Sequence, residues 1–463
     1  MTTLKQSDFL RVNGGRAFGN ELPLRADFVP NTDSRDLAPG QTFVCLRGPN
    51  FDGHDFIGVA IAKRCAAVVV DDLTKLPTDC PVPIIAVDNA KSAYLAGASQ
   101  ARRLATAWVI AITGSNGKTT TKAMAQSLLS RKFKVVATLQ NENNELGVSK
   151  QCYALAGAEI AVFEFGSRHP GDIAQLVRIA SPDVAVLTSV AEAHLEYFAG
   201  QEELAREKFS IFAQGARPVC NAADAWTRNL ARQAGIDAGA LWVRLGDDPA
   251  CGGVTLEVRG PQDGRVTMSF ANARADAPWK LLGVHHLRDA MLAAGAALSS
   301  GLSFDDVVAG LPDLRLPGGR FEKHATASGA TVIYDAYNAN PTSMECALRA
   351  FAELPATRRV AVLASMAELG GEARLFHERT GCAAATVGLQ ALYCGGEHAA
   401  ALARGAVAGG MDAARVSVYA DNSELAAELV RTLGPGDAVL LKGSRAYKME
   451  QILDALLARH ALA

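Results

Sequence analysis

The stretch Trp108-Val109-Ile110-Ala111-Ile112-Thr113-Gly114-Ser115-Asn116-Gly117-Lys118-Thr119-Thr120 joins an apolar, strand-like run directly to a glycine-rich turn. A helical stretch, residues 122–130, follows the turn. In such a strand–turn–helix unit, the backbone N–H groups of the turn and the N-terminus of the helix surround anionic phosphates. Lys118 would neutralise the β- and γ-phosphates, and the Thr119 hydroxyl would ligate Mg²⁺. The stretch therefore predicts a parallel α/β domain that binds a nucleoside triphosphate.

The turn departs from the strict phosphate-binding motif GxxxxGK[ST], whose first glycine would fall at Ile112. It matches a shorter form, Gly114-x-x-Gly117-Lys118-Thr119. The alternative interpretation is a tight strand–helix turn with an exposed lysine, but the flanking strand and helix favour phosphate binding. The candidate nucleotide-binding residues of the turn are Gly114, Ser115, Asn116, Gly117, Lys118, Thr119 and Thr120.

The bulk composition excludes several classes of protein. Lys and Arg number 46 against 48 Asp and Glu, so no excess of positive charge favours nucleic acid or a membrane surface. The nine cysteines include no CxxC pair, which is typical of a reducing compartment. The N-terminus shows no apolar signal-peptide core, and no apolar run reaches the ~18–20 residues that span a bilayer. We expect a cytoplasmic protein without stable membrane insertion.

Short β-rich apolar runs alternate with longer Ala- and Leu-rich stretches along almost the whole chain, which indicates βαβ units and mainly parallel sheets. A chain of 463 residues also exceeds what one hydrophobic core usually organises. A hairpin is expected within residues 253–270, and a Pro/Gly-rich linker within 311–319. We predict three α/β domains: 1–101, a P-loop ATPase-like parallel-sheet domain at 102–313, and a Rossmann-like domain at 314–463.

Further motifs occur in a fixed order on both sides of the phosphate-binding turn. They are Thr32-Asp33-Ser34-Arg35 with residues 51–56, Asn143-Asn144-Glu145-Leu146-Gly147, residues 335–344, and Lys442-Gly443-Ser444-Arg445. Together with the short turn they resemble the Mur ligase family of ATP-dependent amide ligases. The segment 335–344 is most similar to the branch of that family that adds D-alanyl-D-alanine to a cell-wall precursor.

The resemblance implies a reaction and a set of substrates. ATP would activate the carboxylate of UDP-MurNAc-tripeptide as an acyl phosphate, and the amine of D-Ala-D-Ala would then attack it, leaving ADP and phosphate. The N-terminal domain would hold the UDP-sugar, the central domain ATP and metal ions, and the C-terminal domain would close on the nucleotide and admit the amine. We expect a monomer. The third residue of the tripeptide is not specified by the sequence.

The resemblance also implies two Mg²⁺ ions and a catalytic group of Lys118, Glu164, His194 and Lys208. Thr119 and Glu164 would ligate metal, His194 would serve a second metal, and Lys208 would be carbamylated to supply anionic oxygens. Carbamylation needs a neutral amine, so the site would have to lower the pKa of Lys208. By themselves, a single histidine is more often a surface or core residue, and a lysine on an amphipathic helix is usually solvated.

The remaining expected contacts also come from the resemblance. Arg320 would contact the nucleotide phosphates and Asp335 the ribose, whereas the alternative is that Arg320 caps the linker and Asp335 closes a strand. The other nucleotide-side candidates are His285, Asp289 and Asn338. The substrate-side candidates are Ser34, Arg35, His54, Asn143, Asn144, Tyr337 and Asn340.

The chain departs from the family pattern at three places. His286 and Asp289 replace asparagines on the adenine side, which changes the available hydrogen-bond donors. Ala364-Ser365 stands where Gly-Asp is usual, and Ser167-Arg168 is unusual. These changes favour, as rival hypotheses, a ligase recruited to another peptide or a nucleotide-binding protein without ligase activity. Against the latter, Lys118, Glu164, Lys208 and the other predicted reactive residues are all present.

Overall fold

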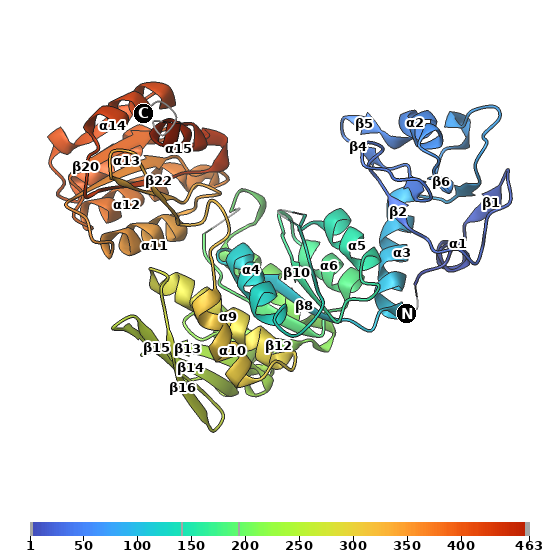
Figure 1. The fold of residues 1–463 in the computed structure, drawn as a ribbon, viewed down its shortest axis with the longest axis horizontal. Helices are drawn as coiled ribbons and strands as arrows, with labels where there is room; N and C mark the ends of the chain where they lie inside the picture. Colours follow the sequence, from blue (N-terminus) through green and yellow to red (C-terminus); the bar gives the residue numbers. More distant parts are fainter. Residues whose placement is uncertain (1–2, 140–141, 193–194, 459–463) are drawn as a thin grey trace.

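The computed structural model describes residues 3–139, 142–192 and 195–458. Its three large β-sheets, of five, nine and six strands, lie in three separate lobes (Figure 1). The lobes follow one another along the chain, with the nine-stranded sheet in the middle lobe. This mixed α/β architecture with parallel sheets agrees with the predicted fold class. The exact domain boundaries stay predictions.

The N-terminal lobe is built on a five-stranded sheet of order β1-β7-β6-β3-β2, parallel except for β1. A two-stranded ribbon, β4–β5, lies beside it. The strands are β1 (Arg16–Phe18), β2 (Pro30–Asn31), β3 (Thr42–Val44), β4 (Arg47–Gly48), β5 (Phe51–Asp52), β6 (Ala67–Val70) and β7 (Ile84–Ala86). The helices are α1 (Gln6–Asn13), α2 (Ile57–Ala62) and α3 (Ala90–Leu104).

The central lobe carries a nine-stranded sheet of order β16-β15-β14-β13-β12-β11-β8-β10-β9, parallel from β9 to β14. The expected hairpin is confirmed as antiparallel β14–β15, and β16 extends it. The strands are β8 (Trp108–Thr113), β9 (Val135–Ala137), β10 (Ile160–Glu164), β11 (Val184–Leu187), β12 (Arg217–Asn221), β13 (Leu241–Leu245), β14 (Val254–Gln262), β15 (Arg265–Phe270) and β16 (Ala273–Pro278). The helices are α4 (Lys118–Leu129), α5 (Glu145–Tyr153), α6 (Asp172–Ala180), α7 (Gln201–Phe209), α8 (Ala225–Gln233), α9 (Val284–Ser299) and α10 (Phe304–Gly310).

The C-terminal lobe has a six-stranded sheet of order β17-β18-β22-β19-β20-β21, in which only β17 is antiparallel. The strands are β17 (Glu322–Ala325), β18 (Thr331–Tyr334), β19 (Arg358–Ala364), β20 (Ala391–Gly395), β21 (Val416–Tyr419) and β22 (Asp437–Lys442). The helices are α11 (Pro341–Ala352), α12 (Ala373–Ala385), α13 (Ala399–Ala408), α14 (Asn422–Thr432) and α15 (Glu450–Leu457).

The central sheet is buried on both faces, which explains why β8 is apolar at nearly every position. Ile110 and Ile112 pack into one core with α4 and α9, whereas Val109 and Ala111 pack into the opposite core with residues of α5 and α6. The sequence of a parallel strand that is covered on both faces is a continuous apolar run, without alternating polar and apolar residues. This burial fixes the end of β8, and therefore the start of the phosphate-binding turn.

Helix α3 joins the N-terminal and central lobes without a flexible connector. It packs against α1 on one side and against α5 and α6 on the other. Its Arg102 donates to the Ala180 carbonyl oxygen at 2.8 Å and forms an ion pair with Asp183 at 2.7 Å. The helix spans residues 90–104, so it runs across the boundary predicted after residue 101.

The carboxyl ends of the strands bring the predicted site residues of the central lobe to one edge. The phosphate-binding turn follows β8, and Glu164 ends the neighbouring β10 opposite Ile112. On the other side of β8, Leu187 of β11 pairs with Thr113. Open parallel α/β sheets bind ligands at this edge.

Candidate active site

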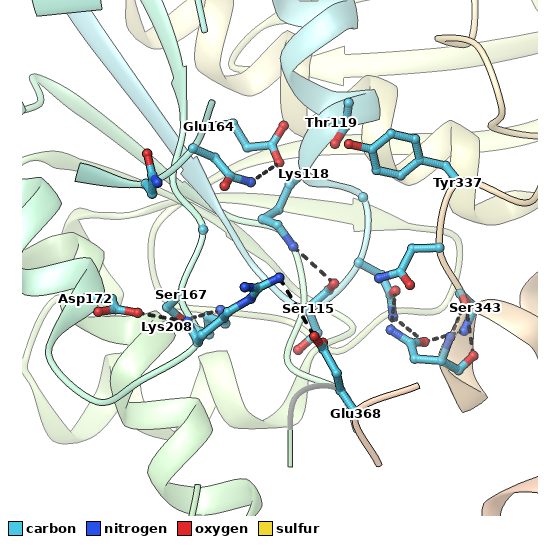
Figure 2. Close-up of a pocket in the computed structure, with 18 of the residues that line it drawn as sticks. Ser115, Lys118, Thr119, Glu164, Ser167, Asp172, Lys208, Tyr337, Ser343 and Glu368 are labelled. Atoms are coloured by element: carbon cyan, nitrogen blue, oxygen red, sulfur yellow. Dashed lines mark hydrogen bonds and ion pairs between the residues drawn. The ribbon is translucent and has the colours of Figure 1, made fainter. Parts of the chain in front are cut away.

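A cavity of about 580 Å³ lies between the central and C-terminal lobes (Figure 2). Its lining includes most of the residues predicted for nucleotide, metal and amine-substrate binding. From the central lobe these are Ser115, Asn116, Gly117, Lys118, Thr119, Asn143, Asn144, Glu164 and Lys208, and from the C-terminal lobe Arg320, Tyr337, Asn338 and Asn340. The structure therefore brings together residues that are more than 200 positions apart in the sequence.

The phosphate-binding turn requires both of its glycines. Gly114 has φ +146° and Gly117 φ +82°, which are backbone conformations that other residues rarely adopt. A Cβ atom at Gly114 would clash with Thr188 Oγ1, and one at Gly117 would clash with Asp289 Oδ1. Ser115 N donates to the Ser189 carbonyl oxygen at 2.7 Å, which anchors the turn to the end of β11. The turn is thus held in a fixed shape at the start of α4.

Lys118 is folded back over the turn that carries it. Its Nζ donates to the carbonyl oxygens of Gly114 at 2.7 Å and Ser115 at 3.3 Å. Burial lowers the pKa of Lys118, while the nearby Glu164 carboxylate acts in the opposite direction. An anionic phosphate in the cavity would add a second favourable charge and stabilise the protonated amine.

Glu164 is a buried carboxylate at the floor of the cavity. Asn143 Nδ2 donates to its Oε1 at 3.0 Å, and Lys122 Nζ lies 3.5 Å from its Oε2. Oε2 itself accepts no hydrogen bond from the described residues. A buried carboxylate oxygen without a hydrogen-bond donor is an uncommon and costly arrangement. It leaves Oε2 available to a cation bound in the cavity.

Lys208 of α7 is a buried amine at the cavity wall, and only 1% of its surface is exposed. Its Nζ donates to Ser167 Oγ at 2.6 Å. Burial and the charge of nearby Lys118 lower the pKa of Lys208 to about 7, although Glu207 and Asp172 oppose this shift. An amine with this pKa is largely neutral at slightly alkaline pH, which is the form that carbamylation requires.

The segment between β10 and α6 is clamped by carboxylates at the cavity wall. Asp172 accepts from the backbone N–H groups of Arg168 and His169 at 2.8 and 2.9 Å. Glu207, next to Lys208, accepts from the N–H groups of Gly171 and Ile173, both at 2.7 Å. Negative charge at the N-terminus of α6 is favourable because it complements the helix dipole.

Arg320 and Tyr337 form the C-terminal wall of the cavity. The Arg320 guanidinium carbon lies 4.3 Å from the centroid of the Tyr337 ring. Arg320 Nε is buried and has no hydrogen-bond partner among the described residues. A stacked guanidinium with an unused donor is well suited to bind a phosphate.

Asn340 connects the C-terminal lobe directly to the phosphate-binding turn. Its Nδ2 donates to Asn116 Oδ1 at 2.7 Å, and Asn116 Nδ2 donates back to Asn340 Oδ1 at 3.2 Å. The same Oδ1 accepts from Ser343 N at 2.9 Å and so caps α11. We refer to Asn116 and Asn340 as the amide pair. Because both ends of the Asn340 amide are engaged, the structure does not leave it open for a substrate.

Several predicted residues lie outside this cavity. Both carboxylate oxygens of Asp335 are used within the C-terminal lobe: Lys442 Nζ donates to Oδ2 at 2.7 Å and Phe321 N to Oδ1 at 3.2 Å. His285 packs against His286, with ring centroids 3.9 Å apart. His286 Nδ1 donates to the Leu282 carbonyl oxygen at 2.6 Å, so this ring is a hydrogen-bonded part of the interior. His194 lies outside the described residues.

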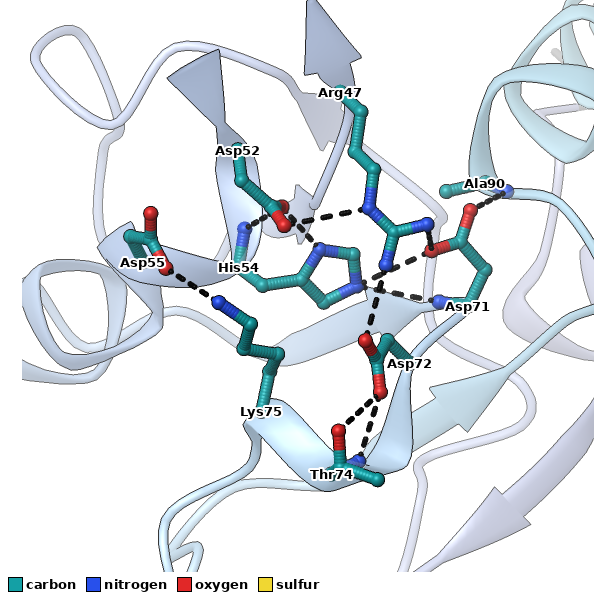
Figure 3. A network of polar contacts seen from close by, with 9 residues as sticks. All are labelled: Arg47, Asp52, His54, Asp55, Asp71, Asp72, Thr74, Lys75 and Ala90. Atoms are coloured by element: carbon teal, nitrogen blue, oxygen red, sulfur yellow. Dashed lines mark hydrogen bonds and ion pairs between the residues drawn. The ribbon is translucent and has the colours of Figure 1, made fainter.

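His54 is enclosed in a polar network in the N-terminal lobe (Figure 3). Its Nδ1 donates to Asp52 Oδ1 at 2.6 Å, and Asp71 N donates to its Nε2 at 3.4 Å. Arg47 pairs with both carboxylates. The His54 side chain is fully buried and lines neither cavity, so in this structure it supports the β4–β5 ribbon. Its predicted contact with the substrate stays a prediction.

A second cavity, of about 760 Å³, lies between the N-terminal and central lobes. It is lined by Thr32 and Asp33 of the predicted sugar-binding segment and by Asn144, which also lines the first cavity. Ser34 and Arg35 are not part of its lining, and Arg35 is exposed and pairs with Asp33 at 2.6 Å.

Asp289 lies against the phosphate-binding turn, where its carboxyl faces Gly117. Burial raises the pKa of Asp289 to about 8, although Arg320, Arg288 and the Thr121 hydroxyl act in the opposite direction. This carboxyl group is therefore mainly protonated at neutral pH and can donate a hydrogen bond. In this respect it is similar to the side-chain amide of the asparagine that Asp289 replaces in the family pattern.

Replacing Asp289 with Asn should change how stability depends on pH. The folded wild type keeps the proton up to about pH 8, whereas the unfolded chain loses it near its ordinary pKa of about 4. Wild-type stability therefore falls as pH rises between these values, and the Asn variant lacks this loss. In urea unfolding, the free energy of unfolding of the variant relative to that of the wild type should rise by on the order of 2 kcal/mol between pH 5.5 and 8. A pH-independent difference would mean that Asp289 is ionised throughout.

The residues of the first cavity fit a hard cation in part. Thr119 and Glu164 offer a hydroxyl and a carboxylate with one unused oxygen, which are the ligand types that Mg²⁺ prefers beside phosphate oxygens and water. Within residues 3–139, 142–192 and 195–458, no three His, Cys, Asp or Glu side chains converge as a metal cluster. A metal would therefore depend on the nucleotide for much of its coordination.

Comparison with known proteins agrees with this geometry. Three family models match in order: "Mur ligase family, catalytic domain" at residues 30–103, "Mur ligase middle domain" at 112–297, and "Mur ligase, glutamate ligase domain" at 319–445. The UDP-N-acetylmuramoyl-tripeptide–D-alanyl-D-alanine ligase of Escherichia coli (strain K12) is 31% identical, over 98% of this chain and 99% of that protein. The chain belongs to the Mur ligase family.

Solved structures extend the likeness of this Mur ligase to its whole fold. MurF from Acinetobacter baumannii superposes with a TM-score of 0.84 at 27% identity and covers 98% of each chain. MurF from Thermotoga maritima, crystallised in complex with ADP, has a TM-score of 0.80 at 27% identity, over 94% of this chain and 99% of that one. The three-lobed architecture is therefore that of MurF enzymes, and the chain is an ATP-dependent ligase.

Sequence reasoning missed several residues of the Mur ligase cavity. Arg168, Asp172 and Glu368 line it, and Lys122 pairs with Glu164 beneath it. Lys122 lies one helical turn after Lys118, a spacing that places both on one face of α4. That spacing could have indicated that both amines approach Glu164.

No described helix is both long and apolar enough to cross a membrane.

Proposed function

We propose that the chain catalyses ATP-dependent amide formation between UDP-MurNAc-tripeptide and D-Ala-D-Ala, with ADP and phosphate as the other products. The observation that carries this proposal is the cavity in which Lys118, Glu164 and Lys208 of the central lobe face Arg320 and Tyr337 of the C-terminal lobe. The names of the relatives from Escherichia coli and Bacillus subtilis support the same substrates.

The chemistry explains why these charges are gathered there. Bound ATP with Mg²⁺ supplies the phosphoryl group that activates the carboxylate of the UDP-linked peptide. Both reactants are anions, so positive groups must offset their repulsion as they approach. Lys118 and Arg320 provide such groups on opposite walls of the cavity. We propose that Thr119 and Glu164 hold the first Mg²⁺ and that a carbamylated Lys208, with His194, serves a second.

The contact between the central and C-terminal lobes supports a two-step reaction. The amide pair brings α11 against the phosphate-binding turn, so the wall that carries Tyr337 and Asn338 adjoins the nucleotide site. Excluding water from such a site protects an acyl phosphate from hydrolysis until the amine arrives. We propose that the UDP-sugar enters through the second cavity, which shares Asn144 with the first.

The nine free cysteines fit a reducing cytoplasm, and we expect a monomer.

The amine specificity can be tested directly. UDP-MurNAc-tripeptide and ATP are offered with D-Ala-D-Ala, L-Ala-L-Ala or single amino acids, and amide product and phosphate are quantified. We expect kcat/KM for D-Ala-D-Ala to exceed that for L-Ala-L-Ala about 100-fold or more, because productive attack needs the amine held at the carbonyl. Faster reaction with a single amino acid would assign the chain to another branch. No product with any amine would favour a ligase recruited to another peptide.

A further inference from the structure

The mouth of the cavity carries one positive and one negative side chain that come from different lobes. Arg168 follows β10 in the central lobe, and Glu368 follows β19 in the C-terminal lobe. Arg168 Nη2 lies 3.9 Å from Glu368 Oε1, and both residues line the cavity. In Figure 2 the Glu368 side chain extends toward Ser115 of the phosphate-binding turn. Neither residue has a role in the reaction proposed above.

Glu368 is held in an unusual backbone conformation by buried groups. Its φ is +61°, a left-handed value that a side chain other than glycine adopts only when its surroundings require it. Met366 N donates to His377 Nε2 at 2.8 Å, and Ala367 N donates to Ser444 Oγ at 3.0 Å. Burial lowers the pKa of His377 to about 4, so the ring stays neutral and keeps this acceptor. Such strain is typical of residues that are positioned for binding.

Arg168 is also fixed by its backbone while its side chain remains adaptable. Asp172 Oδ2 accepts from Arg168 N at 2.8 Å, but 70% of the Arg168 side chain is exposed. The Glu368 side chain is 29% exposed. An ion pair at 3.9 Å with one partner in solvent contributes little stability. The pair can therefore open at small energetic cost.

We propose that Arg168 and Glu368 form the recognition site for a zwitterionic amine substrate, a short peptide with a free ammonium group and a free carboxylate. The carboxylate would bind the Arg168 guanidinium and the ammonium group would bind the Glu368 carboxylate, and both of these contacts would be charge-assisted hydrogen bonds. The less exposed cations Lys118 and Arg320 line the cavity beside the phosphate-binding turn, which leaves Arg168 for the carboxylate of the amine substrate. This inference rests on the proposed function.

The test separates the two half-reactions. Acyl-phosphate formation from ATP and UDP-MurNAc-tripeptide is measured without dipeptide, by trapping with hydroxylamine as the hydroxamate. Amide formation is then measured with D-Ala-D-Ala and with its C-terminal amide, which lacks the carboxylate charge. In Glu368→Gln, KM for D-Ala-D-Ala should rise about 10- to 100-fold, since one charged hydrogen bond is lost. Hydroxamate formation should be unchanged.

Arg168→Met gives an independent result because it keeps the length of the side chain. The wild type should use the dipeptide amide about 10- to 100-fold less efficiently than D-Ala-D-Ala, and Arg168→Met should use both equally poorly. The exposed residues Glu372 and Arg178 lie outside the cavity, so Glu372→Gln and Arg178→Met serve as matched controls with wild-type kinetics. An unchanged KM in Glu368→Gln, or preserved discrimination in Arg168→Met, overturns the inference. So does loss of hydroxamate formation in either variant. Absence of hydroxamate with the wild type instead refutes the proposed function.

Discussion

Replacing Lys118 with Ala should reduce kcat about a thousandfold while leaving the protein folded. Among the described residues, Lys118 bonds only to carbonyl oxygens of its own turn, and burial lowers its pKa. Its amine is therefore poised to be stabilised by a phosphate. Removing one charged donor from a site where negative charge develops costs about 10²- to 10³-fold in rate, and loss of ground-state phosphate contacts adds to this. The measurement is phosphate release at saturating substrates.

The folding control for this variant is also specified by the structure. Lys118 is half-buried and forms no ion pair with a carboxylate of the described residues, so its removal should not lower the unfolding midpoint. Lys132→Ala removes an exposed lysine just beyond the same helix, and it should retain wild-type kcat. Near-normal turnover by folded Lys118→Ala would refute the role of this lysine.

Replacing Lys208 with Ala should abolish nearly all turnover, and a short carboxylic acid such as acetate should restore part of it. The neutral amine reacts with CO₂ to give a carbamate and a proton, and the carbamate supplies the anionic oxygens that Mg²⁺ prefers. Because the pKa of Lys208 is lowered to about 7, the neutral amine predominates above that pH. Wild-type activity should therefore rise as pH increases through about 7 and should fall when CO₂ is removed.

The carbamate itself can be observed by ¹³C NMR after incubation with labelled bicarbonate. The wild type should show a carbamate resonance that Lys208→Ala lacks. Glu202→Ala removes an exposed residue in the first turn of α7, away from Lys208 in the last turn, and should keep both the resonance and the activity. A wild-type protein that is fully active without any carbamate signal would contradict the prediction.

The sequence specified the local elements of the site well but its long-range pairings poorly. The apolar run before Gly114 located β8, because a strand buried on both faces has few polar positions. His54 was predicted to bind the substrate because residues 51–56 resemble the UDP-sugar-binding segment of the family. Its burial depends on Asp71, which the fold brings from a separate strand end. Nothing local to residues 51–56 indicates that contact.

Asn340 illustrates the same limit across lobes. Its sequence neighbourhood predicted a position at the ligand-binding edge of the sheet, because it follows a strand of a parallel sheet, and Asn340 lines the first cavity. Its partner Asn116 lies 224 residues away, so no local pattern showed that the amide would be engaged by the phosphate-binding turn rather than by a substrate. Arg168 and Glu368 are also far apart in the sequence, so no local pattern indicated that they lie close together in the cavity.

The amide pair has a consequence for the timing of the catalytic cycle. It consists of two hydrogen bonds between neutral groups, each worth about 1 kcal/mol after exchange with water. Separation of the lobes would then be disfavoured by only about 30-fold in population through this contact. Asn340 would keep its bond to Ser343 N, so α11 would stay capped when the lobes part. The amide pair therefore forms when the two lobes come into contact, but it is too weak to keep them together once the amide product has formed. ADP and phosphate can then leave.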